Sequence, residues 1–321
     1  MGFSLFVLHM GNRRTVTLRQ YLRGWLQLLR LPNLLTVPGD PLAGAALHAL
    51  ACGQPPEPAR LGLGVLAAFG FYCGGLLLND LVDLPIDTIL RPERPLPHQT
   101  VPVEQAALAM ILAFGGALGA AFSLGFHAGA TGLALLACIF AYTLVGKPLG
   151  GAAAALSMGL CRGLSVMLLA PVAGWGSWPA WLAVAVTLYV AGLTAVSLKE
   201  NRSAHVGGLA WLPLAGAALH GAVFAMVAFA HAVSLWLPGV AAALAILTLA
   251  VALLADASRR LHGQGPRSPQ ETRRGVARFI HLLPLLQSWP LLLEPSLAGL
   301  GLLIALGAPL AMAAGRRYAG S

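Results

Sequence analysis

The chain has 321 residues, of which 58% are hydrophobic and only 10% are charged, so its composition is not that of a water-soluble globular domain. Lys and Arg total 20 against 11 Asp and Glu, which gives a formal net charge of +9. In a membrane protein such an excess marks loops on one side, and no basic and aromatic tract indicates a nucleic-acid partner. The four cysteines form no C-x-x-C pair and the nine histidines form no H-E-x-x-H motif, so zinc has no support.

Apolar runs of about 20 residues recur along the whole chain, and a helix of that length crosses a hydrocarbon core of about 30 Å. The runs are continuous and rich in Leu, Ala and Gly, whereas a transmembrane barrel needs short alternating segments. We therefore predict an all-α fold, a polytopic bundle of nine to ten transmembrane helices. The ten candidate stretches are 33–51, 61–82, 103–124, 128–146, 152–173, 178–198, 208–231, 235–255, 275–293 and 297–315.

The basic residues indicate the orientation of the chain. With the amino terminus in the cytoplasm, ten spans place nearly all Lys and Arg on the cytoplasmic side, whereas nine spans would leave Arg316 and Arg317 outside. We prefer ten spans and expect a multi-pass protein of a bacterial-type inner membrane, although the ninth stretch could instead be re-entrant or interfacial. The expected division is a cytoplasmic leader over 1–24, one transmembrane domain over 25–315 with a flexible loop at 256–278, and a tail over 316–321.

Three of the eleven acids, Asp80, Asp83 and Asp87, fall within eight residues at the end of the second stretch. On a helix these acids and Asn79 can all face one way. Carboxylates so close repel one another unless a cation lies between them. Because Mg²⁺ is usually held by one or two carboxylates together with substrate phosphates, this segment predicts a platform for a Mg²⁺–diphosphate.

Three arginines extend this interpretation. Arg91 and Arg94 follow the acids at once and can grip phosphate oxygens in bidentate fashion. A merely solvated helix end is the alternative, but it does not explain why the acids cluster here. Arg162 lies inside an apolar run, where a charge is costly enough to suggest a function. It either provides a polar lining for a substrate site or is a structural partner of an acid or of helix carbonyls.

The acid-rich segment, N-D-x-x-D-x-x-x-D followed by R-P-x-R-P-L-P, resembles the first motif of the UbiA superfamily of intramembrane prenyltransferases. Arg30-Leu31-Pro32-Asn33 before the first stretch, Tyr142 with Lys147 closing the fourth, and M-G-L-C-R-G-L in the fifth agree with it. The likeness covers about residues 25–255. It implies a bundle around a cavity that opens laterally to lipid, Mg²⁺ as cofactor, and as substrates a polyprenyl diphosphate and a small, aromatic or lipid-like acceptor.

The second motif of that family, D-x-x-D-x-x-x-D after the sixth stretch, is degenerate here. The corresponding residues 197–204 read S-L-K-E-N-R-S-A, so Glu200 alone retains an acid. Lys199 agrees with family members that carry a lysine there. Glu200 either helps hold a second Mg²⁺ with Asn201 and waters, or acts as a base or acceptor-orienting group with His205.

These residues form one hypothesis of mechanism, in which charge on the departing diphosphate is offset while an allylic cation forms. Tyr142 would stabilise that cation through its ring face. The expected metal ligands are Asn79, Asp80, Asp83 and Asp87, the expected catalytic residues are the three acids with Glu200 and Tyr142, the expected diphosphate-binding residues are Arg91, Arg94, Lys147, Lys199 and Arg202, and Asn33 and Arg162 are expected to line the cavity.

Three alternatives remain open at this point. A terpene cyclase of the same superfamily would ionise the same diphosphate without a second substrate. A non-catalytic isoprenoid or lipid carrier or transporter would place its ionisable residues at mid-membrane, whereas these acids lie at its border. A structural scaffold gives no reason for the clustered acids.

Overall fold

The computed structural model describes residues 16–170, 177–200, 205–231, 236–263, 265 and 267–318, and it contains helices and no β-strand within these ranges. Eight helical segments of the described chain are long and apolar enough to cross a membrane. They are α4 (Pro58–Val82), α6 (Val103–Ser123), α7 with its extension (Phe126–Leu149), α10 (Trp178–Ser197), η2 with α11 (Gly207–Ala230), α12 (Leu237–Leu261), α13 (Pro269–Leu293) and η3 with the first part of α14 (Pro295–Ala314).

Two shorter helices, α3 (Gly39–Cys52) and α9 (Gly151–Met167), account for the remaining two of the ten expected stretches. Each expected stretch therefore contains one main α-helix, and the all-α membrane bundle is confirmed. Length and composition qualify eight of these ten helices, so they do not confirm a count of nine or ten. The ninth stretch lies in α13, which is one continuous helix.

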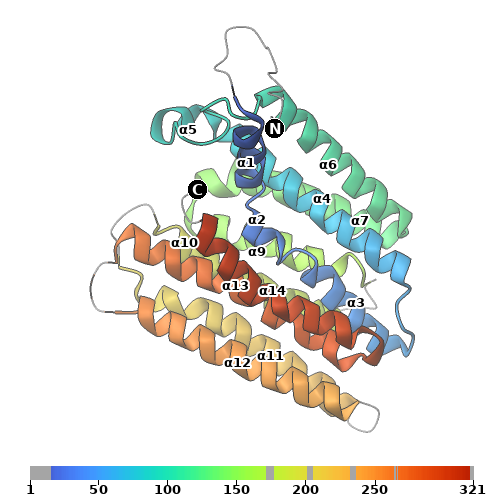
Figure 1. Cartoon of the computed structure of the whole chain (residues 1–321). Coiled ribbons are helices and arrows are strands. Elements are labelled where there is room, and N and C mark those ends of the chain that lie inside the picture. The colour runs from blue at the N-terminus through green and yellow to red at the C-terminus, as the bar shows by residue number, and fades with distance from the viewer. Residues whose placement is uncertain are drawn as a thin grey trace, which may run out of the picture.

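The helices divide into two packed groups (Figure 1). One hydrophobic cluster joins α3 to α10, α11, α12, α13 and α14, and a second joins α4, α6 and α7. Helix α13 lies innermost, because 83% of its most apolar window is buried against 28–56% in the other seven long segments. Helix α9 connects the groups, packing against α10 on one side and α7 on the other.

Small residues set the closest helix contacts, because a glycine lets two backbones approach. A Cβ added at Gly70 of α4 would lie 2.7 Å from the carbonyl oxygen of Ala113 in α6. A Cβ at Gly159 of α9 would overlap the carbonyl of Thr187 in α10. A Cβ at Gly115 would meet nothing within 4 Å, so not every G-x-x-x-G in the sequence marks a helix contact.

The long polar segment is shorter than the sequence indicates, and the expectation of a loop over 256–278 is wrong for most of its length. Helix α12 continues to Leu261, and its last turns include an exposed ion pair between Arg260 and Asp256. Helix α13 begins at Pro269, where Ser268 and Glu271 form a capping box. Charged side chains at a helix end were misinterpreted as a loop. The expected boundary at residue 24 falls inside α1 (Leu18–Leu28).

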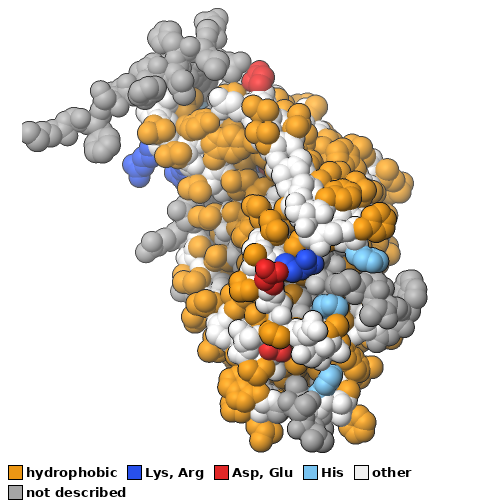
Figure 2. All heavy atoms as spheres, turned by 90° about the vertical axis from the view of Figure 1, so that its right-hand side faces the viewer, with side chains coloured by type: hydrophobic (Ala, Val, Ile, Leu, Met, Phe, Trp, Pro, Cys, Tyr) orange, Lys and Arg blue, Asp and Glu red, His pale blue; other side chains and the backbone are white. Residues whose placement is uncertain are grey.

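Three short helices lie at the end of the bundle where α4 ends, and α1 and α5 both contribute residues to one hydrophobic cluster there, Trp25 and Leu84 (Figure 1). They are α1, α2 (Leu31–Leu34) and α5 (Leu84–Leu90), and α1 packs against α4. Elsewhere the surface is largely hydrophobic: Figure 2 shows one side of the molecule on which charged side chains are few. Such a surface suits contact with lipid, and the polar chemistry is concentrated at the end that carries α1 and α5.

Candidate active site

The acid-rich segment keeps a helical path through the junction of α4 and α5. The backbone N–H of Asp83 donates to the carbonyl of Asn79, and that of Asp87 donates to the carbonyl of Asp83. Helical geometry therefore continues although a new helix, α5, begins at Leu84, and Pro85 is readily accommodated in its first turn. As a result Asn79, Asp83 and Asp87 follow one another on one face.

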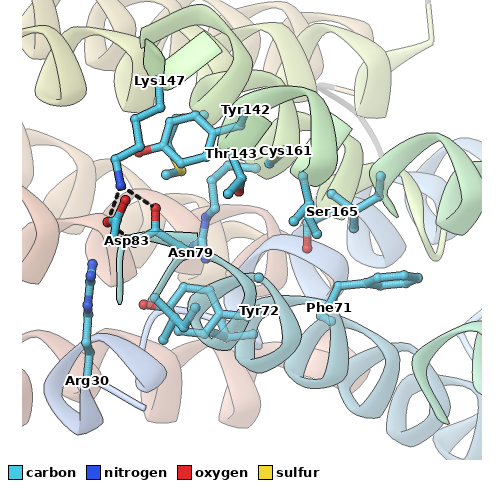
Figure 3. A pocket seen from close by; sticks show the side chains of 18 of the residues that line it. Arg30, Phe71, Tyr72, Asn79, Asp83, Tyr142, Thr143, Lys147, Cys161 and Ser165 are labelled. Carbon is cyan, nitrogen blue, oxygen red and sulfur yellow. Dashed lines mark hydrogen bonds and ion pairs between the residues drawn. The ribbon is translucent and has the colours of Figure 1, made fainter. Parts of the chain in front are cut away.

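Lys147, which follows α7 in the chain, contacts two residues of this segment, Asn79 and Asp83 (Figure 3). Its ammonium donates to Asn79 Oδ1 at 2.9 Å and forms a short ion pair with the Asp83 carboxylate. The amide of Asn79 also donates to Asp83 Oδ2 at 3.2 Å. Two oxygen ligands from α4 thus converge on one positive charge.

The other two acids lie beside this point and have basic partners of their own. Arg94 Nη1 is 2.6 Å from Asp87 Oδ2 and 3.8 Å from Asp80 Oδ1. Arg30 Nη2 is also 3.8 Å from Asp80 Oδ1. These cations offset the electrostatic repulsion between the three neighbouring carboxylates. Among the described residues, no three His, Cys, Asp or Glu side chains gather as a metal cluster.

A π-helical turn over Tyr142–Gly146 presents both Tyr142 and Lys147 to the site. Residues five apart lie on different faces of an α-helix with 3.6 residues per turn. The wider i→i+5 turn accommodates the extra residue, so both side chains line the same cavity. Tyr142 and Lys147, at the end of the fourth stretch, can therefore both line the cavity only because the helix contains this π-helical turn.

A cavity of about 270 Å³ extends from these polar groups into the bundle. Asn79, Asp83 and the basic side chains form its mouth, while Asp80 and Asp87 do not line it. Its walls come from α4, α7 and α9. The apolar lining residues are Val37, Ala68, Phe71, Leu76, Leu135, Ile139 and Met158.

Arg162 lines the same cavity and is held by a buried polar network. Its Nε lies 2.8 Å from Asp40 Oδ2, and its Nη2 donates to the carbonyl of Thr36 at 2.8 Å. Gln287 of α13 donates to both that carbonyl and Asp40. Both interpretations of Arg162 therefore have a geometric basis, since it pairs with an acid and faces the cavity.

The side chains of Glu200 and Lys199 have different surroundings, although the two residues are adjacent in the sequence. Burial raises the pKa of the Glu200 carboxyl above its ordinary value of 4.5, while the positive charges of Arg273, Arg30 and Arg91 oppose that shift. Glu200 thus lies among cations that include two residues of the cavity mouth. Lys199 instead lines a second cavity between α9, α10 and α11. Arg202 lies outside the described residues.

Sequence reasoning gave no role to several side chains that the site uses. Arg30 has a left-handed backbone, with φ of 49°, and its guanidinium reaches both Asp80 and the cavity. Tyr72 lines the cavity, and its hydroxyl faces the side chain of Asn33. The sequence indicated Arg30 only through its place before Leu31-Pro32-Asn33. Tyr72 lies within an apolar run, and nothing in the sequence indicated a role for it.

The donor set at the cavity mouth fits Mg²⁺. The amide oxygen of Asn79 and a carboxylate oxygen of Asp83 already converge on the ammonium of Lys147, which stands where a cation would be held. Mg²⁺ prefers such oxygen ligands and fills its remaining positions with waters and phosphate oxygens.

A model of the UbiA prenyltransferase family matches residues 41–283. Two curated relatives are digeranylgeranylglyceryl phosphate synthases. The protein from Ignicoccus hospitalis is 40% identical over 103 residues, or 31% of this chain and 32% of its own. The protein from Methanosarcina mazei is 34% identical over 142 residues, or 44% of this chain and 48% of its own. The matches thus span about a third and about half of these relatives.

Solved structures show the same fold. A UbiA homologue from Aeropyrum pernix K1, without ligand, has a TM-score of 0.58 at 19% identity and covers 85% of this chain and 98% of its own. A UbiA homologue from Archaeoglobus fulgidus, bound to GPP and Mg²⁺, has a TM-score of 0.53 at 16% identity and covers 83% and 99%. At these identities the likeness concerns the fold.

Proposed function

Because the chain belongs to the UbiA prenyltransferase family, we propose that it transfers a prenyl group from a polyprenyl diphosphate to a small acceptor within the membrane. The observation that carries this proposal is the convergence of Asn79, Asp83 and Lys147 at the mouth of an apolar cavity. A diphosphate would bind at that mouth, and its isoprenoid chain would occupy the cavity between α4, α7 and α9.

We propose that binding exchanges the partners of the charged groups. In this structure Lys147 forms an ion pair with Asp83, and Arg94 forms one with Asp87. Asn79 and Asp83, supported by Asp80 and Asp87, would hold Mg²⁺. That ion supplies charge neutralisation at the diphosphate oxygens. Lys147 and Arg94 would then leave their acids and bind the diphosphate oxygens. Arg91 and Arg30 line the same cavity and would bind the diphosphate with them.

The reaction breaks the bond between the first prenyl carbon and the diphosphate oxygen, and the electron pair leaves with the diphosphate. Preorganised cations at the mouth stabilise the growing charge on that group, which is commonly the largest catalytic contribution. The ring of Tyr142 stabilises the allylic cation that remains. The apolar walls exclude water, which would otherwise capture this cation.

The acceptor supplies the electron pair for the new bond to the prenyl carbon and then loses a proton. Glu200 is the candidate base, since its raised pKa improves its ability to take a proton. Arg162 and Asn33 line or adjoin the cavity and provide polar contacts for an acceptor that is aromatic or lipid-like. The names of the two curated relatives favour the lipid-like class.

We place this site at the cytoplasmic face of a bacterial-type inner membrane, because loops on that side carry the excess of Lys and Arg. Arg91, Arg94 and Lys147 lie at the site end of the bundle, and Arg259 and Arg260 end α12. The donor would enter sideways from the lipid, with its chain already in the bilayer.

The test is incubation of the purified protein in lipid with Mg²⁺, prenyl diphosphates of several lengths and a panel of acceptors. We expect pyrophosphate release and a prenylated lipid product, both lost when the metal is chelated. Asp83→Asn should lower turnover by about 100-fold or more, as the loss of a preorganised electrostatic group does. Asp256→Asn removes an exposed acid outside the cavity and is the matched control, expected to leave turnover unchanged.

Unchanged turnover in Asp83→Asn would contradict the assignment of the site. Product formation from the diphosphate alone would identify a terpene cyclase. Binding of prenyl diphosphates without pyrophosphate release, under every combination of acceptor and chain length, would identify a carrier.

A further inference from the structure

A second cavity lies away from the site described above, between α9, α10 and α11. It has a volume of about 620 Å³. It uses the first turns of α9, through Gly151 and Ala152, whereas the first cavity uses later turns of that helix, through Cys161 and Arg162. Gly151 follows shortly after Lys147, so both cavities lie toward the same end of the bundle.

Small side chains make this second cavity hollow. Ala152 of α9, Ala195 of α10 and Ala215 of α11 stand on its three walls. A Cβ added at Gly151 would meet nothing within 4 Å, which agrees with open space at that corner. Leu156 and Leu188 on its rim are 50% and 45% exposed, so the cavity opens on the outer surface that faces lipid.

Among the described residues that line this cavity, Lys199 is the one that carries a charge. It lies two residues beyond the last residue of α10, Ser197. Its side chain is partly buried and has no hydrogen bond or ion pair with the described part of the chain. An ammonium that is partly desolvated without a counter-charge favours an anionic ligand.

An apolar cavity with one basic group fits an amphiphilic ligand, one with a hydrocarbon chain and an anionic headgroup. An apolar groove open to lipid accommodates a hydrocarbon chain, and each buried CH₂ contributes to binding. A basic group at the end of a membrane helix attracts an anionic headgroup. We propose that this groove is a binding site for one anionic phospholipid of the leaflet that the active site faces, with its phosphate on Lys199 and one acyl chain between α9, α10 and α11.

The alternative occupants fit less well. A polyprenyl diphosphate carries more negative charge, yet the described lining of the second cavity offers one cation and no side-chain oxygen ligand for Mg²⁺ like those that Asn79 and Asp83 supply at the first cavity. A zwitterionic lipid would bring its own positive charge close to Lys199. The proposal does not depend on turnover, because lipid retention can be measured without any substrate.

The experiment is native mass spectrometry of the delipidated full-length protein after addition of phosphatidylglycerol or phosphatidylcholine with the same acyl chains. We expect one phosphatidylglycerol to be retained in preference to phosphatidylcholine. Lys199→Gln should weaken that retention about fivefold, as expected for the loss of one basic residue near a membrane surface. Arg259→Gln removes an equal charge from an exposed position outside the groove and should not change retention.

A second pair of variants tests the apolar part. Ala152→Leu and Ala215→Leu place larger side chains at exposed positions on two walls, where they fill the groove without entering the packed core. Both should reduce phosphatidylglycerol retention while the helical circular dichroism stays unchanged. The proposal is overturned if Lys199→Gln retains phosphatidylglycerol as well as the parent protein does. It is also overturned if phosphatidylcholine or a prenyl diphosphate binds this groove more tightly than phosphatidylglycerol.

Discussion

The ion pair of Asp40 and Arg162 gives the sharpest test of what holds the two helix groups together around the cavity. Asp40 is 0% exposed and the Arg162 side chain is 12% exposed, so neither charge is well solvated. Removing one partner of a buried pair typically costs about 3–5 kcal/mol, because the other charge is left uncompensated. We expect Asp40→Ala to destabilise the fold by about that amount, since Arg162 would keep its hydrogen bond to the Thr36 carbonyl but lose its counter-charge.

The double variant Asp40→Ala with Arg162→Met removes both charges, and the Met side chain approximates the length of the apolar stem of Arg. It should be more stable than Asp40→Ala alone, because replacing a buried ion pair by hydrophobic residues is often neutral or stabilising. Reversible unfolding in bicelles or mixed micelles measures the four states of this cycle. The exposed pair of Asp256 and Arg260 is the control, and Asp256→Ala should produce no measurable change. Strictly additive effects of the two buried substitutions would refute the reasoning.

Two further predictions concern the acceptor side of the site and the packing of α4. Because the pKa of Glu200 is raised, turnover should fall as pH drops through a value above 4.5, and Glu200→Gln should lose this limb together with about 100-fold of rate. The same raised pKa stabilises the folded protein below 4.5, and that contribution declines as pH rises through the folded-state pKa; an identical stability profile in Glu200→Gln would contradict the assignment. Gly70→Ala should lower the thermal midpoint, because its Cβ would lie 2.7 Å from a backbone carbonyl of α6, whereas Gly115→Ala, with nothing within 4 Å, should not. Equal midpoints for these two variants would show that the α4–α6 contact relaxes freely.

The local part of the site could be predicted from the sequence, because helical spacing alone places Asn79, Asp83 and Asp87 on one face. Their hydrogen-bonded path through the α4–α5 junction follows that spacing. The membrane bundle was likewise predictable, since lipid requires each backbone polar group to be satisfied within its own helix. The count of spans was not, because α3 and α9 are shorter than a bilayer requires.

Contacts between distant segments were beyond the sequence. Nothing in the apolar surroundings of Asp40 indicates that it pairs with Arg162, or that Gln287 of α13 would donate to it. The reach of Arg30 depends on a left-handed residue between α1 and α2, a conformation that side chains other than glycine rarely adopt. Such pairings arise from the packing of three or more helices, and no single stretch contains their signal.

Lys199 and Glu200 show how a motif can join residues that the fold separates. Sequence reasoning assigned both to one site because the family motif includes both positions. Successive residues in a helical turn point about 100° apart, so neighbours on such a turn face different surroundings. Glu200 therefore lies among Arg273, Arg30 and Arg91, while Lys199 faces the groove between α9, α10 and α11. If the two proposals hold, substitutions at these neighbouring positions should have separate effects: Glu200→Gln should change turnover, and Lys199→Gln should change lipid retention.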